Sequence, residues 1–92
     1  MGFEYRLRFS CEDESAVLAD LLRLRGATQT GPTSVEYRSP DNAAWKMPDA
    51  MFQLDADGAY FCDFGGAGAE FMGRIVSKLV ARVGAVTVED WE

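Results

Sequence analysis

Two neighbouring segments in the middle of the chain contain residues whose types and spacing could support chemistry. The first is DADG, in which Asp55 and Asp57 precede Gly58 as they would in a calcium-binding loop. With Gly58 at the glycine position, Gln53 and Phe64 fall where that loop needs an acidic residue and a bidentate glutamate. The segment therefore predicts a hairpin turn, and we expect neither a metal nor a cofactor.

The second segment is a glycine cluster between an expected strand and an expected helix. The backbone N–H groups of Gly65, Gly66 and Gly68 could hold a phosphate or another small anion at the helix N-terminus. A dinucleotide-binding fingerprint needs a third glycine where Phe71 stands, and the Lys-Ser/Thr pair of a P-loop is missing. A flexible entry to a closely packed helix is the favoured interpretation, and an effector-binding domain that uses this loop is the alternative.

Covalent and acid–base catalysis have little support in the sequence. The chain has no histidine, so its serines lack the usual activating base. Its two cysteines, Cys11 and Cys62, are far apart and form no CxxC motif, which argues against a zinc or redox site. We assign no catalytic residue, and an oligomeric enzyme with a site between subunits is a further alternative.

Hydrophobic periodicity predicts the elements that position these residues. Phe3 to Phe9 alternate with polar residues, as in a strand with one buried face. Ser10 and Asp13 resemble a capping box before an apolar helical face that ends at Gly26. A short strand at Val35 to Tyr37 follows a loop.

The second half of the chain predicts a hairpin, a helix and a last strand. The strands span Met51 to Leu54 and Ala59 to Phe64, the helix Ala69 to Val83, and the last strand Val86 to Val88. The order β-α-β-β-α-β predicts one α+β domain over residues 1–92, a ferredoxin-like split βαβ sandwich with two helices on one face of an antiparallel sheet. We expect the strand order 4-1-3-2, with Met51 to Leu54 as an extra strand at the sheet edge.

Composition and charge limit the class of partner. No apolar run approaches the length of a membrane span and no signal peptide is evident, so we expect a cytoplasmic protein. The net charge of -6 repels nucleic acid and attracts a basic protein. The RNA-recognition motif shares the expected topology, but Asp57 stands where it needs a basic residue. Nucleic acid is therefore an unlikely partner.

Two surfaces are candidates for docking a protein. On the sheet face away from the helices, the alternation places Glu4, Arg6, Arg8, Glu36, Arg38, Thr87, Glu89 and Trp91. Arginine and tryptophan dominate binding hot spots, so Arg6, Arg8, Arg38 and Trp91 are predicted partner-binding residues. Trp45, Lys46 and Met47 form a second candidate because they are an apolar cluster in a loop between prolines.

The sequence thus favours a small acidic protein-binding module. An inhibitor, an immunity-type protein or a regulatory protein for a basic partner would suit this size and charge. A homodimer through the open sheet face is a further expectation, because such a face is often covered by a second copy.

Overall fold

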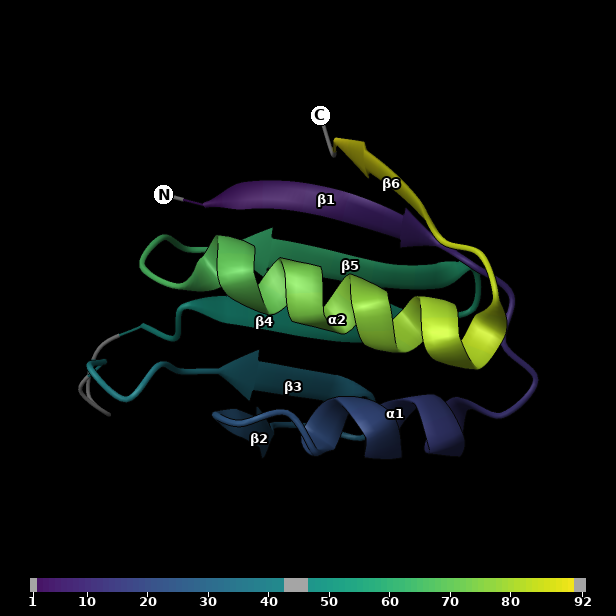
Figure 1. Cartoon of the computed structure of the whole chain (residues 1–92), viewed down its shortest axis with the longest axis horizontal. Helices are drawn as coiled ribbons and strands as arrows, with labels where there is room; N and C mark the ends of the chain where they lie inside the picture. The colour runs from purple at the N-terminus through teal and green to yellow at the C-terminus, as the bar shows by residue number, and fades with distance from the viewer. Residues whose placement is uncertain (1, 43–46, 91–92) are drawn as a thin grey trace.

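The computed structural model of the protein describes residues 2–42 and 47–90. Along the chain it contains β1 (Phe3–Arg8), α1 (Glu14–Leu22), β2 (Ala27–Gln29), β3 (Ser34–Tyr37), β4 (Ala50–Asp55), β5 (Gly58–Asp63), α2 (Gly68–Val83) and β6 (Thr87–Asp90). Figure 1 shows the two helices lying against one face of a single sheet. The predicted α+β architecture is confirmed at this level.

The sheet has six strands in the order β2-β3-β4-β5-β1-β6, and all neighbouring strands are antiparallel. The expected order 4-1-3-2 is not matched exactly: its strands correspond to β6, β1, β5 and β3 and keep that relative order, but the extra strand β4 lies between β5 and β3 instead of at the edge. Phe52 and Leu54 are buried there, and β4 pairs with a strand on each side. The true edge next to β3 is β2, a three-residue strand that the sequence pattern did not reveal.

The two helices connect parallel strands that are not neighbours. Because all neighbouring strands are antiparallel, β2 runs parallel to β1, with three strands between them. For the same reason β6 runs parallel to β5, with β1 between them. Each helix therefore belongs to a split βαβ unit. Strands β2 to β5 form an antiparallel meander that joins the two units.

The ends of the helices differ slightly from the prediction. Helix α1 is capped by Asp13, whose side chain accepts a hydrogen bond from the Ala16 N–H at 3.2 Å, and not by Ser10. It ends at Leu22 instead of near Gly26, because Arg23 closes the last turn with its N–H bonded to the Asp20 and Leu21 carbonyls. Helix α2 ends before Gly84 as predicted.

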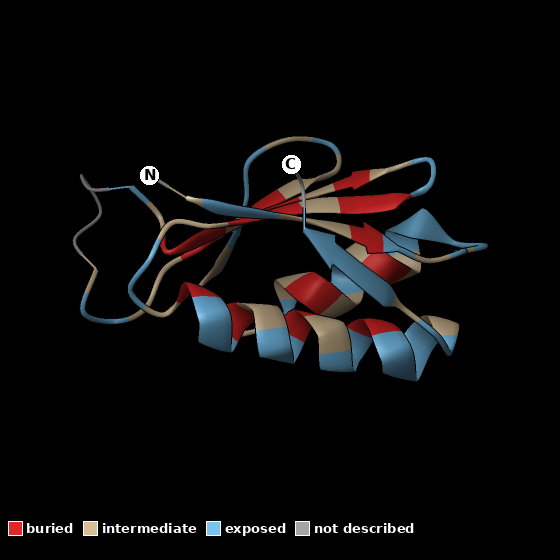
Figure 2. Ribbon diagram, turned by 90° about the horizontal axis from the view of Figure 1, so that it is seen from above, coloured by how far each residue is buried: buried red, intermediate tan, exposed pale blue. Residues whose placement is uncertain are grey.

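The core lies between the helices and the sheet. Its buried members are Leu7, Val17, Leu21, Val35, Tyr37, Ala50, Phe52, Leu54, Ala59, Phe61, Phe71, Ile75 and Leu79. Helix α2 contacts β5 and β4, and α1 contacts β2 and α2. Figures 1 and 2 show that neither helix extends over β1 and β6, and every residue of β6 is exposed.

Candidate interaction surfaces

The open face of the sheet gathers the arginines that were predicted to bind a partner. The register places Arg6 and Arg8 of β1 on this face with Glu89 of β6, since Arg6 is opposite Glu89 and Arg8 is opposite Thr87. Arg8 Nε donates to Glu89 Oε1 at 2.7 Å, which forms an ion pair across the two strands. Arg38, just beyond β3, has an Nη2 atom 3.9 Å from Glu36 Oε1. Each of these arginines thus faces a carboxylate of its own chain.

The Arg6 side chain is the least exposed of this group. Its guanidinium reaches across β5 to Asp55, with Nη2 2.9 Å from Oδ1 and a second bond from Nη1 to Oδ2. Gly58 lies between Arg8 and Asp55 in the register. The hydrogen bonds from Arg6 hold the pKa of Asp55 below its ordinary value. Asp55 therefore fixes Arg6 in addition to closing the β4–β5 turn.

This ion pair leads to a prediction about acid sensitivity. Because the pKa of Asp55 is lowered in the folded protein, its contribution to stability is present above its unfolded pKa of about 3.9 and is lost as pH falls through its folded pKa. We expect Arg6→Met to lower the melting temperature at pH 7 and to have a smaller effect at pH 3. The matched control is Arg8→Met, since the Arg8 side chain is 55% exposed and that of Arg6 is 11% exposed. Equal effects of the two substitutions at pH 7 would contradict the prediction.

A second cluster on the open face joins Tyr60, Glu4 and Cys62. The Tyr60 hydroxyl donates to Glu4 Oε1 at 2.9 Å, and burial together with Glu4 and Cys62 raises the pKa of Tyr60. Burial also raises the pKa of the Cys62 thiol, which keeps the sulfur protonated and poorly nucleophilic. The sequence analysis missed this cluster because only the pairing of β1 with β5 brings its members together.

The glycine loop lies against two carboxylates of the chain itself. Asp63 Oδ1 accepts a hydrogen bond from the Gly65 N–H at 2.8 Å. A Cβ atom at Gly66 would lie 2.9 Å from Asp49 Oδ1, and one at Gly68 would lie 1.9 Å from Asp63 Oδ1. The absence of side chains at Gly66 and Gly68 therefore lets the carboxylates approach closely. Anion binding here stays a prediction, and these negative charges oppose it.

Asp49 is the buried member of this pair and was not singled out by the sequence analysis. It accepts hydrogen bonds from the Ser39 N–H at 2.8 Å, from Asn42 Nδ2 at 2.7 Å and from the Ala67 N–H. Burial alone would raise the pKa of Asp49, but these hydrogen bonds hold it below its ordinary value. Asp49 thereby ties the loop after β3 to the start of α2.

The predicted loop cluster is described only at Met47, which is 60% exposed. Trp45 and Lys46, like Trp91, lie outside the described residues. The Met47 carbonyl accepts a hydrogen bond from Asn42 Nδ2 at 2.9 Å. Met47, Gly65 and Gly66 line one shallow hollow, so two surfaces that the sequence predicted separately are neighbours.

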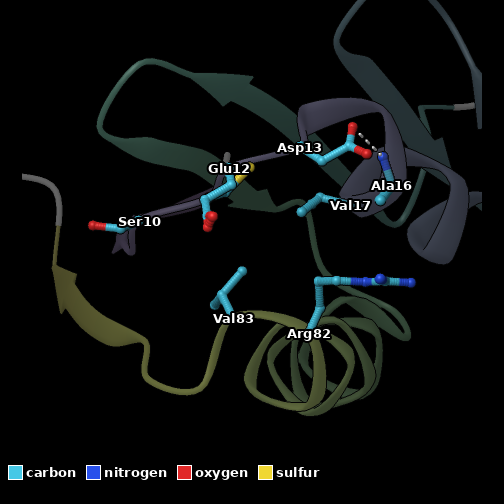
Figure 3. Close-up of a pocket in the computed structure, with 8 residues that line it drawn as sticks. Ser10, Glu12, Asp13, Ala16, Val17, Arg82 and Val83 are labelled. Atoms are coloured by element: carbon cyan, nitrogen blue, oxygen red, sulfur yellow. Dashed lines mark hydrogen bonds between the residues drawn. The ribbon is translucent and has the colours of Figure 1, made fainter.

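A deeper hollow separates the start of α1 from the end of α2 (Figure 3). It measures about 440 Å³ and is lined by Ser10, Cys11, Glu12, Asp13, Ala16, Val17, Arg82 and Val83. Asp13 caps α1, and Arg82 Nε bonds Asp20 Oδ2 at 2.8 Å, so the main polar groups already have partners. A neighbouring hollow that shares Ser10 and Val83 adds Asp57. The exposed Glu12, Asp13, Glu14 and Asp57 form what we call the acidic end.

Metal-binding clusters, membrane-spanning helices and disulfides are each absent from the described residues. No three acidic or cysteine side chains among residues 2–42 and 47–90 are grouped so that they could hold a metal ion. Across the same residues, none of the helices has the length and apolar character required to span a bilayer. The cysteines, Cys11 and Cys62, are both free thiols.

On the helix side of the sheet, the part over β1 and β6 that neither helix covers carries exposed apolar residues. Val88 is opposite Leu7, so it faces the helix layer as Phe3 and Tyr5 do, yet Phe3 is 67% exposed and Val88 is 41% exposed. The sequence analysis missed this exposure because alternation predicts which face of a strand is apolar but not whether a helix covers it.

Helix α2 extends this apolar surface. Arg82 and Lys78 lie on the flank of α2 that meets Asp20 of α1. At 100° per residue, Val76 and Val80 occupy the opposite flank, which is directed to the β1–β6 side. Val80 is 43% exposed. We call the set of residues Phe3, Tyr5, Val76, Val80 and Val88, which lie along the β1–β6 side of the helix layer, the apolar margin.

Comparison with known proteins gave no relative. No protein-family model matches the chain, and no curated protein or solved structure matches it either. Function is therefore inferred from the surfaces described above.

Proposed function

We propose that the protein is a small acidic protein-binding module that docks its partner at the apolar margin. One observation carries this proposal. Of the four large apolar side chains that are most exposed in the described part of the chain, Phe3, Val80 and Val88 belong to the margin, and the fourth, Met47, does not. Apolar side chains gathered on one side of a small domain are typical of an interaction site.

The charge of the protein supports a basic partner. The net charge is -6, and Arg6, Arg8 and Arg38 are each beside a carboxylate of the chain. Exposed carboxylates at the acidic end are then left to steer a positively charged protein during its approach. Such a partner would be inhibited or regulated by the contact, as expected for a cytoplasmic inhibitor, immunity-type or regulatory protein.

The split βαβ units support a ferredoxin-like description of the fold. On this proposal, a ferredoxin-like sandwich has been enlarged by two strands inserted between its second and third strands. The observed neighbours β6-β1-β5 correspond to strands 4-1-3 of the expected ferredoxin-like order 4-1-3-2.

The other candidate functions receive less support. An effector domain at Gly65, Gly66 and Gly68 would need to overcome the charges of Asp49 and Asp63. A homodimer through the open face would cover side chains that are already joined by ion pairs within the chain. An enzyme with a site between subunits gains no support from Cys62, because burial raises the pKa of its thiol and keeps the sulfur poorly nucleophilic.

Affinity capture with matched surface variants tests the proposal. We expect Phe3→Ser with Val80→Ser to lose at least about 90% of the captured partner, since apolar anchors carry most of the binding energy at an interface. Met47→Ser, at the other candidate surface, is the control and should retain it. The folded fraction of each variant is checked by circular dichroism. Loss of the partner with Met47→Ser but not with the double variant would transfer docking to the loop that contains Trp45 and Lys46.

A further inference from the structure

The outer edge of β6 is an unoccupied position in the sheet. β6 is last in the strand order, and in residues 2–42 and 47–90 no strand pairs with its outer side. In an antiparallel ladder, alternate residues direct their N–H and C=O groups to opposite sides. Two of the four residues Thr87 to Asp90 therefore direct these groups to β1, and the other two direct them outward. Such an edge is a template for another strand.

Edge pairing with a second copy of the chain is opposed by charge. An antiparallel pair of β6 strands would bring Glu89 and Asp90 of both copies into one seam. Like charges on paired strands are destabilising. Asp90, which lies on the same face of β6 as Val88, has no ion pair with any described cation.

The same charges suit a basic strand. We propose that an extended basic segment of the partner adds to the outer edge of β6 as a seventh strand; this inference rests on the proposed function and specifies its chemistry. On the helix side, an apolar residue of the added strand would lie beside Val88 and the apolar margin. On the open side, the alternating Lys or Arg residues would lie beside Glu89, whose carboxylate is bonded to Arg8 through Oε1 and can accept hydrogen bonds from a second cation. Backbone hydrogen bonds provide affinity in this mode, and the alternating side chains provide specificity.

Two features of β6 fit this role. The strand is exposed along its whole length, so a partner can reach its edge without displacing another element. It also carries Val88, a member of the apolar margin, so one extended segment can contact Val88 while pairing with the backbone of β6.

The test uses a peptide of eight alternating valine and lysine residues, titrated into the ¹⁵N-labelled full chain. We expect amide shift changes centred on Thr87 to Asp90 and slower hydrogen exchange of the outward N–H groups. The control peptide has the same sequence with alternate amides N-methylated, which preserves charge and side chains but blocks pairing along one edge. It should bind at least about tenfold more weakly.

The outcomes separate this inference from the proposed function. Equal binding of the two peptides, or shifts confined to the acidic end at Glu12 to Glu14 and Asp57, would overturn strand addition. No shift at millimolar peptide would overturn it as well. If the double variant at Phe3 and Val80 still loses the captured partner, the docking surface stands and only the mode of docking is wrong. A peptide of alternating valine and glutamate that shifted β6 equally would overturn the charge argument.

Discussion

Gly58→Ala is expected to destabilise the protein by about 3 kcal/mol or more. Gly58 has φ +139°, a conformation that residues with a side chain rarely adopt. A Cβ atom there would lie 2.0 Å from the Leu7 carbonyl oxygen and 3.1 Å from the Arg8 Cα. β1 cannot move away without disturbing its pairing with β6 on the other side. Urea unfolding of the variant and the wild type measures the difference.

The matched control is Gly73→Ala in the middle of α2. Gly73 is exposed, and a Cβ atom there would have no neighbour within 4 Å. This substitution should stabilise the protein by about 0.5–1 kcal/mol, because alanine loses less backbone entropy than glycine in a helix. A Gly58→Ala variant as stable as the wild type would show that β1 and β5 do not approach each other as described.

Local patterns in the sequence predicted most helices and strands, but they did not predict the complete order of the strands in the sheet. The alternation in β1 and the apolar stripe of α2 repeat over several residues, and both elements were predicted. β2 has only three residues, Ala27 to Gln29, two of them polar, which is too short for a period to be visible. The central position of β4 depends on its pairing with β3 and β5, which is information from distant parts of the chain.

The candidate surfaces were also predicted only in part. Period-2 alternation was sufficient to place Arg6 and Arg8 on the open face. It could not predict that Arg6 pairs with Asp55, since those residues are 49 positions apart and Asp55 was already explained as a turn residue. The exposure of Val88 and Phe3 was missed for a similar reason, because it depends on where the two helices pack across the sheet.

Asp49→Asn is expected to destabilise the protein by about 2–3 kcal/mol at pH 7. The carboxylate accepts hydrogen bonds from Ser39, Asn42 and the Ala67 N–H while it is buried. Asparagine keeps the shape but offers an NH₂ group where a second oxygen is needed, so one of these donors loses its acceptor. Melting temperatures of the variant and the wild type measure this loss.

The effect of Asp49→Asn should depend on pH in one direction. Hydrogen bonding keeps the pKa of Asp49 below its ordinary value in the folded protein, so the stability it contributes is present above the unfolded pKa of about 3.9. That contribution is lost as pH falls through the folded pKa, and the gap between wild type and variant should narrow in acid. Asp41→Asn, an exposed acid in the same loop, is the control and should change stability by less than about 0.5 kcal/mol. A gap for Asp49→Asn that widened in acid would mean that the carboxyl is protonated in the folded protein, and the loop would then be held by a neutral donor instead of a charged acceptor.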